Sequence, residues 1–402
     1  MSLLTQPVVA AHAPSSSATR DHNTSAEVAK LFRTRTASRR LRVPTAVVYC
    51  EGSFGTLDGK TANGLIRQSE KYQILSVIDS EKAGLDSGIV LDDKTNAIPI
   101  CLDLADALAH ADSVPDYFIL GMAPANGMLL THERDLILQA IGLGMHVVNG
   151  LHEFLSDDPI IAAASAAMNV KILDIRKPRA KVDLRSFSGR IGGVTCPRVA
   201  VLGTDCAIGK RTTATILTRA LNDHGVKAVL VCTGQTGLIQ GARYGVALDS
   251  VPSQFCSGEM EATVVDAFEG ESPDIIIIEG QGALSHPAYS TSSFILRGSC
   301  PHGVVLQHAP GRTHRCDFEE TVMPTPASEI NLIQTFAKTK VIGLTINHEN
   351  MTSAEVDAAI TQYEYDLGIP VTDALRRSPE RLVDMVVRAF PGLEKELIAA
   401  AV

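Results

Sequence analysis

The chain has 402 residues, enough for two domains, and 45% of them are hydrophobic, so each domain can bury a core. Aromatic residues make up only 4% of the chain and tryptophan is absent, which argues against stacking on nucleic-acid bases. The formal net charge of −9 argues against nucleic acid or an acidic membrane as the partner. We therefore expect a small-molecule substrate.

The eight cysteines are scattered, with no CxxC pair and no Cys/His cluster at zinc spacing. This pattern predicts no metal centre and indicates reduced thiols inside a cell. No window of about 18 uncharged apolar residues occurs, so the sequence predicts no membrane span. The predicted compartment is the cytoplasm.

Residues 1–43 differ from the rest of the chain. They are rich in Ser, Thr and Arg, and their only acids are Asp21 and Glu27. We expect a flexible basic extension, with a short helix over Ala26–Phe32. The alternative is an organellar transit peptide, which has a similar composition.

From residue 44 to 176, short apolar runs alternate with helical patterns, which is typical of βαβ units and a parallel sheet. The sequence thus predicts a Rossmann-like N-terminal half. The expected strands are Ala46–Cys50, Ile74–Ile78, Tyr117–Leu120, His146–Val148 and Lys171–Ile175, and the expected helices are Leu65–Glu70, Leu102–Ala111, Glu133–Leu143 and Ile160–Met168.

The first turn of this half carries Gly52, Gly55 and Gly59-Lys60-Thr61, and its second strand ends in Asp79. A dinucleotide site has its glycines spaced as GxGxxG, with an acid at the tip of the next strand. The glycine spacing here does not fit. A structural or substrate-facing loop is therefore favoured over a nucleotide site.

Two further loops follow strands of this half, where ligands bind in open sheets. One contains Asn126, and the other contains His152 and Glu153. A loop His and Glu can be catalytic, although such residues more often cap or close a loop.

Residues 177–197 are a linker by composition, and residues 198–402 alternate strands and helices again. We predict an α/β protein in which this C-terminal half is a P-loop NTPase-like domain. The expected strands are Val199–Leu202, Ala228–Cys232, Asp274–Ile278, Val304–Gln307 and Val341–Ile346, and the expected helices lie near Thr212–His224, Glu259–Phe268, Ser328–Lys338 and Ser353–Leu367.

The most informative stretch is VAVLGTDCAIGKRTT at the start of this half. A strand, a glycine-rich turn and a helix start in this order form a phosphate cradle, because unpaired N–H groups and the helix dipole point at the anion. The predicted binding residues are Gly203, Thr204, Asp205, Gly209, Lys210, Arg211, Thr212 and Thr213.

The stretch departs from the usual P-loop. Five residues separate Gly203 from Gly209 instead of four, and Arg211 takes the place of the hydroxyl residue that holds magnesium. A guanidinium beside Lys210 suits a phosphate or pyrophosphate bound without metal.

Polar residues follow the other strands of this half, and the loops at these carboxyl ends should converge on one crevice. Glu279, after four isoleucines, could hold magnesium through water or act as a general base, and His286 is a second candidate for proton transfer. Arg243 and Arg312 are candidates for binding a carboxylate or phosphate. Further candidate substrate contacts are Asp249 and Gln281.

The runs GTDCAIGKRTTA, PDIIIIEGQG, SHPA, GMAPANG and NGLHEFLSDDP closely resemble a bacterial family that includes D-glutamate N-acetyltransferases, also described as D-amino-acid N-acetyltransferases. The resemblance spans residues 45–390. The C-terminal half is also weakly similar to dethiobiotin synthetase, whose loop shares GTD, five residues between glycines, and GK.

The family resemblance implies an acyltransferase of D-amino-acid catabolism, with acetyl-CoA as donor and the amino group of D-glutamate as acceptor. Glu279 or His286 would then be the base. The alternative is an ATP- and Mg²⁺-dependent ligase or kinase that uses Lys210, Thr212 and Glu279. A homo-oligomer is expected because symmetric assemblies are common.

Overall fold

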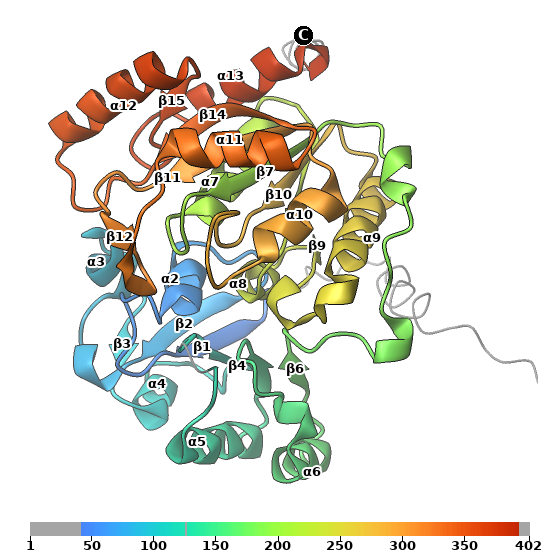
Figure 1. Ribbon diagram of the computed structural model, residues 1–402. Coiled ribbons are helices and arrows are strands. Elements are labelled where there is room, and N and C mark those ends of the chain that lie inside the picture. Colours follow the sequence, from blue (N-terminus) through green and yellow to red (C-terminus); the bar gives the residue numbers. More distant parts are fainter. Residues whose placement is uncertain (1–41, 125–126, 394–402) are drawn as a thin grey trace, which may run out of the picture. The chain divides into compact units, whose positions relative to one another are not determined.

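The computed structural model describes residues 42–124 and 127–393 (Figure 1). The predicted helix over Ala26–Phe32, nearly all of the basic extension and the candidate residue Asn126 lie outside these residues.

Six parallel strands form the sheet of the N-terminal half, in the order β3-β2-β1-β4-β5-β6. Their bounds are β1 Thr45–Tyr49, β2 Gln73–Ile78, β3 Ile100–Cys101, β4 Tyr117–Leu120, β5 His146–Asn149 and β6 Ile172–Asp174. Every residue of β1 is buried, because helices cover both faces of the sheet (Figure 1). Strands β2 and β3 are added on one side of β1, and strands β4 to β6 on its other side, so the strand order reverses between β1 and β4 as in a Rossmann sheet. The predicted Rossmann-like architecture is confirmed.

The helices of this half are α2 Lys60–Arg67, α3 Ser87–Asp92, α4 Leu104–Ala109, α5 Thr131–Gly142 and α6 Pro159–Ala167. The prediction for the first of them was wrong, since α2 begins five residues before Leu65. Its sequence contains Gly64 and its first turn has only one apolar residue, Ala62, so the apolar pattern does not mark where the helix begins. Tertiary contacts stabilise its end: Nε2 of Gln240, from the C-terminal half, donates to the carbonyl oxygens of Gly64 at 2.5 Å and Gln68 at 2.7 Å.

Seven parallel strands form the sheet of the C-terminal half, in the order β15-β14-β11-β7-β10-β8-β9. Their bounds are β7 Arg198–Gly203, β8 Ala228–Cys232, β9 Tyr244–Gly245, β10 Ile275–Glu279, β11 Gly303–His308, β14 Lys340–Ile346 and β15 Val371–Thr372. The five predicted strands are confirmed within two residues at each end. The two edge strands were not predicted, because two residues give no usable pattern.

Helices pack on both faces of this sheet (Figure 1). One face is covered by α7 Lys210–Asp223 and α13 Glu380–Ala389, and the other by α9 Ser253–Glu271, α10 Thr291–Ser299, α11 Pro326–Phe336 and α12 Ser353–Leu367. A short helix, α8 Gln235–Gln240, follows β8 and packs on α2. The α8, α10 and α13 helices were not predicted. The α8 and α10 helices begin in Gly- or Ser-rich sequence, which is typical of loops. The overall α/β class is confirmed.

The predicted linker lies along α9. The carboxylate of Glu259 accepts a hydrogen bond from the backbone N–H of Arg185 at 2.7 Å, and Glu261 accepts from Ser188 at 2.6 Å and Ile191 at 3.1 Å. These bonds fix the segment over the helix. Both sheets belong to one compact unit, residues 43–402.

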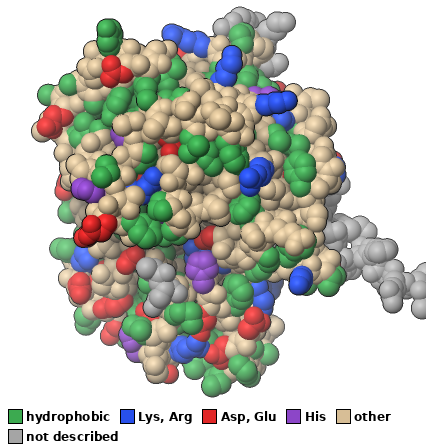
Figure 2. Space-filling model, viewed as in Figure 1, with side chains coloured by type: hydrophobic (Ala, Val, Ile, Leu, Met, Phe, Trp, Pro, Cys, Tyr) green, Lys and Arg blue, Asp and Glu red, His purple; other side chains and the backbone are tan. Residues whose placement is uncertain are grey.

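A two-stranded antiparallel ribbon, β12 His314–Arg315 and β13 Phe318–Val322, follows β11. It places Arg315 and Cys316 beside the glycine-rich loop. Among the described residues, no helix combines the length and apolar character needed to cross a membrane. On the face seen in Figure 2, Lys and Arg side chains are interspersed with acidic and apolar ones and form no continuous basic patch.

Candidate functional site

The loop between β7 and α7 presents its backbone N–H groups to an incoming ligand. Ala207 and Gly209 adopt left-handed conformations, with φ of +48° and +97°. Within the described chain, the N–H groups of residues 205–209 donate no hydrogen bond. Alternating backbone conformations with free N–H groups form an anion-binding nest, and here the nest lies at the N-terminus of α7. This is the geometry that the sequence predicted.

Close packing at the base of the loop explains Gly203. A Cβ atom there would lie 2.8 Å from Cδ1 of Ile208 and 2.9 Å from Cδ of Lys210. A side chain would therefore displace the lysine that the loop positions.

Lys210 is buried and its ammonium donates to the carbonyl oxygen of Asp205. Burial lowers the pKa of this group, because its charge is removed from water. Among the described residues no carboxylate forms an ion pair with it. A phosphate in the nest would supply the missing counter-charge.

The carboxylate of Asp205 points away from the nest and holds the loop from behind. Oδ2 lies 3.1 Å from Nη1 of Arg312 and accepts from the backbone N–H of Cys316 at 2.9 Å. Oδ1 lies 3.7 Å from Nη1 of Arg315. These contacts give the carboxylate of Asp205 a supporting role in the loop, and its contact with a ligand stays a prediction.

Arg312 also holds the loop. Its guanidinium donates to the carbonyl oxygens of Cys206 at 3.0 Å and Ala207 at 3.1 Å and pairs with Glu349. The described residues therefore satisfy this predicted substrate-binding arginine within the protein.

Two hydroxyl residues near the loop are engaged elsewhere. Thr204 Oγ1 lies 2.8 Å from Nδ1 of His308, and Thr213 Oγ1 donates to Gln307 at 2.6 Å. Thr212, half-buried on the first turn of α7, makes no side-chain hydrogen bond to the described residues. Of the two threonines that follow Arg211, Thr212 alone has a hydroxyl available to a ligand or ion.

Glu279 ends β10 beside the loop, at the position predicted. Its Oε2 atom accepts a hydrogen bond from the backbone N–H of Thr233 at 3.0 Å. Burial raises the pKa of this carboxyl, and the positive charge of Arg211 opposes that rise. A carboxylate with increased proton affinity is suited to accept a proton.

His286 is enclosed by Tyr289 and Phe318, with ring centroids 4.6 Å and 5.6 Å away. Nδ1 accepts from the backbone N–H of Ala288 at 3.2 Å, so the proton of the neutral ring is assigned to Nε2. Nε2 faces Oδ1 of Asp205 at 3.7 Å. Burial, with Arg315 nearby, lowers the pKa of this imidazole. The ring is arranged as a hydrogen-bond donor, not as a base.

The other predicted substrate residues each contact another part of the protein. Gln281 donates to the carbonyl oxygen of Thr233 at 2.6 Å. Asp249 pairs with Arg176 at 2.8 Å and lies 3.9 Å from Nε2 of His152. Arg243 is 72% exposed and pairs with Glu271.

The candidate loops of the N-terminal half are closed by internal bonds. The buried carboxylate of Asp79 accepts from the backbone N–H groups of Gly52 at 3.2 Å and Phe54 at 3.1 Å. Glu153 accepts from the N–H of Leu129 at 3.1 Å and pairs with Arg134. These contacts support the structural reading of both residues.

The side chain of Arg211 lines a different part of the molecule from that of its neighbour Lys210. The Arg211 side chain lines a groove of about 300 Å³ between α7 and the segment from α8 to β9. Thr215 and Gln240, which sequence reasoning missed, line the same groove. The spacing of Arg211, Thr215 and Arg219 along α7 places them on one face of the helix, which was a usable signal.

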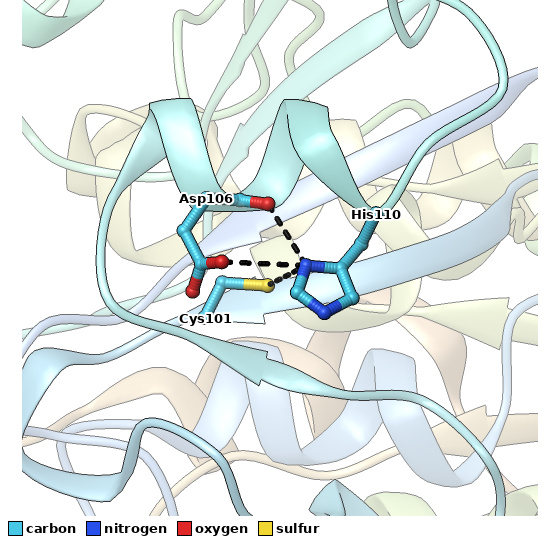
Figure 3. A group of neighbouring side chains, drawn as sticks. All are labelled: Cys101, Asp106 and His110. Carbon is cyan, nitrogen blue, oxygen red and sulfur yellow. Dashed lines mark hydrogen bonds and ion pairs between the residues drawn. The ribbon is translucent and has the colours of Figure 1, made fainter.

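Among the described residues, two groups of metal-ligating side chains each gather around one point. In Figure 3 the contacts of Cys101 and Asp106 converge on one nitrogen, Nδ1 of His110, which lies 2.9 Å from the carbonyl oxygen of Asp106. This is a helix end capped by a side chain. The second group, Asp205, Cys206 and His286, is surrounded by the arginines that neutralise Asp205.

A Rossmann-like sheet joined to a P-loop sheet, with the polar site at the P-loop, defines a two-part α/β protein. The DUF1611 family has this organisation, with a Rossmann-like N-terminal domain that matches residues 80–178 and a P-loop C-terminal domain that matches residues 185–383. The chain belongs to this family.

Similar proteins cover most of the molecule. A crystal structure of a DUF1611 family protein from Anabaena variabilis is 30% identical, with a TM-score of 0.79 over 86% of this chain and 99% of that one. A relative from Pseudoalteromonas sp, named D-glutamate N-acetyltransferase, is 33% identical over 66% of this chain and 80% of its own length. Another with the same name, from Tritonibacter scottomollicae, is 30% identical over 66% and 79%. The family resemblance expected from the motifs is confirmed.

Proposed function

We propose that the protein is an N-acetyltransferase that transfers an acetyl group from acetyl-CoA to the amino group of D-glutamate or a related D-amino acid. The names of the two relatives support N-acetyltransferase chemistry. The observation that carries the proposal is the nest at residues 205–209, where N–H groups without partners among the described residues and the buried ammonium of Lys210 can bind an anion. Arg211 stands where the magnesium-binding hydroxyl residue of the usual P-loop would be.

The nest fits the pyrophosphate of CoA. Backbone N–H groups donate to phosphate oxygens, and Lys210 would leave the carbonyl of Asp205 to pair with the same anion. The hydroxyl of Thr213 is already bonded to Gln307, which counts against a magnesium ion held in the usual way.

Glu279 is the base in this mechanism. Its carboxylate takes a proton from the ammonium of the acceptor, and the resulting amine attacks the thioester carbonyl. The C–N bond forms and the C–S bond breaks, the nitrogen releases its remaining extra proton, and the departing thiolate takes up one proton, so that CoA leaves as a thiol. We favour Glu279 over His286 because Nδ1 of His286 is occupied by Ala288 and the ring presents a proton to Asp205.

Backbone N–H groups can stabilise the oxyanion that develops on the thioester carbonyl. Within the described chain, the N–H groups of Gln281 and Gly282 donate no hydrogen bond. They directly follow Glu279 and Gly280, so base and donors come from one strand end.

The deciding experiment incubates the purified protein with acetyl-CoA and a panel of D- and L-amino acids, with and without EDTA, and identifies products by mass spectrometry. We expect acetylated D-glutamate and an equal amount of free CoA, unchanged by EDTA. Absence of an acetylated amino acid would refute the proposal.

The role of Glu279 is tested with Glu279→Gln. We expect kcat to fall about 100-fold or more, as when a general base is lost. In the unmodified enzyme kcat should decline with acid below a pKa that is higher than that of an ordinary glutamate. The same acid limb in the variant would exclude Glu279 as the titrating base.

The alternative is an ATP- and Mg²⁺-dependent ligase or kinase. Glu279 at the strand end and the available hydroxyl of Thr212 favour it. If this alternative held, the unmodified protein would consume ATP in a magnesium-dependent reaction, and Thr212→Ala would greatly reduce it. Under the acetyltransferase proposal we expect no ATP turnover.

A further inference from the structure

The groove beside α7 is a built polar site that the phosphate nest does not include. Its volume is about 300 Å³, within the range of small-molecule pockets. Arg211 and Thr215 of α7 form one wall, Gln240 and Arg243 form the opposite one, and Gln68 and Glu70 of the N-terminal half also contribute.

Three enclosed polar atoms in this groove have no hydrogen-bond partner among the described residues: Nε of Arg211, Oγ1 of Thr215 and Oε1 of Gln240. Thr215 is only 7% exposed and Gln240 only 4%. The amide orientation of Gln240 is fixed, because its nitrogen donates to two carbonyl oxygens of α2. Buried polar groups are normally paired, so three of them around one groove indicate a polar ligand.

The charges of the groove specify the chemistry of that ligand. Arg211 forms no ion pair within the described part of the chain, whereas Arg243 pairs with Glu271 and Arg219 lies 3.9 Å from Glu70. A carboxylate would satisfy Arg211 and the hydroxyl of Thr215. An ammonium would satisfy the free oxygen of Gln240 and would be attracted by the carboxylates of Glu70 and Glu271, which also line the groove. The two requirements together describe a zwitterion.

The groove lies near the proposed base, because the positive charge of Arg211, which lines the groove, acts on the carboxyl of Glu279. Gly237 lines the groove, and a Cβ atom on Gly237 would lie 3.1 Å from Oε2 of Glu279 and 2.4 Å from Sγ of Cys232. The absence of a side chain at Gly237 lets α8 pack directly against Cys232 and Glu279, which keeps this wall of the groove beside the carboxylate.

We propose that this groove binds the α-amino acid acceptor, with Arg211 and Thr215 holding a carboxylate and Gln240 oriented toward the ammonium. The inference rests on the proposed function, because it assigns the acceptor to a place outside the phosphate nest. It moves Arg211 from the donor site to the acceptor site. The exposed Arg243 is placed to bind a second carboxylate, as in glutamate.

The test compares Arg211→Gln and Thr215→Val with Lys210→Gln. We expect Arg211→Gln to raise KM for D-glutamate at least about tenfold and Thr215→Val about threefold, as for lost charge-assisted and neutral hydrogen bonds, with KM for acetyl-CoA changed less than about twofold. Lys210→Gln should raise KM for acetyl-CoA and leave KM for D-glutamate nearly unchanged. Arg190→Gln, an exposed arginine paired with Glu269 on the protein surface, is the matched control and should change neither constant.

Direct binding separates this inference from the proposed function. Isothermal titration of D-glutamate into the enzyme without acetyl-CoA should give heat for the unmodified chain and for Lys210→Gln, and at least tenfold weaker binding for Arg211→Gln. Binding with this pattern but no acetylated product would refute the acetyltransferase and leave the amino-acid groove standing. Acetylation in which Arg211→Gln raises KM for acetyl-CoA instead would assign the groove to a phosphate of CoA and overturn the inference. Absence of amino-acid binding and turnover would overturn both.

Discussion

The two halves each place a glycine-rich turn between a buried strand and a lysine that begins a helix, and among the described residues a carboxylate of the protein accepts from the N–H groups of only one of these turns. After β1, the carboxylate of Asp79 accepts from the N–H groups of Gly52 and Phe54. After β7, Asp205 is turned toward Arg312 and Arg315 instead, and the nest stays open. A glycine turn is an anion site only where no carboxylate of the protein already occupies its donors.

The largest difference should appear in stability when each carboxylate is neutralised. Asp205→Asn leaves the buried guanidinium of Arg315 without its carboxylate partner and should lower the free energy of unfolding by about 3 kcal/mol or more. Asp79→Asn removes a carboxylate whose partners are mainly N–H groups and should cost about half as much. Urea denaturation at pH 7 measures both, and equal losses would contradict the contrast.

The pH dependence of stability should also come from the C-terminal turn. Burial lowers the pKa of His308, which contacts Thr204, from 6.5 to about 4. As the pH falls below 6.5, the unfolded chain binds this proton and the folded chain does not. Stability should therefore decrease by about 3 kcal/mol between pH 7 and pH 4 on account of this ring.

The contribution of His308 is isolated with His308→Asn. Urea denaturation at both pH values should show a loss on acidification that is smaller by most of this amount. An unchanged loss would place the titration on other groups.

The lysines that follow the two glycine-rich turns, Lys210 and Lys60, test which turn binds an anion. Lys210→Gln should weaken acetyl-CoA binding about 100-fold, roughly 3 kcal/mol, because a buried charge-assisted contact is lost. Lys60→Gln, at the start of α2, should change it less than about twofold. Equilibrium titration with acetyl-CoA measures both constants. A similar loss from Lys60→Gln would show that both turns bind the donor.

The smallest effects should come from the glycines. Gly203→Ala would press on Lys210 and raise KM for acetyl-CoA about tenfold. Gly52→Ala places a side chain at a φ of +62° and should cost about 1 kcal/mol of stability without changing KM. Steady-state kinetics and thermal unfolding of the pair distinguish binding from backbone strain.

The sequence was sufficient for the architecture because buried strands such as Ile275–Glu279 are apolar runs that end in polar residues. It also located the nest, since Gly203, Gly209 and Lys210 act through the backbone and through position alone. The direction of long side chains could not be predicted. Arg312 closes on Asp205 and Glu349, which lie 107 and 37 residues away in the sequence. Gln240 was overlooked because its partners are carbonyl oxygens of another helix.

The amide of Gln240 has an evolutionary consequence. Its nitrogen holds the last turn of α2, the residue lines the groove, and a side chain at Gly64 would come within 3.2 Å of that nitrogen. The residue types at positions 64 and 240 are therefore sterically coupled. An exchange of one half of this chain for that of a distant relative would therefore have to preserve a small residue at position 64 wherever Gln240 is kept.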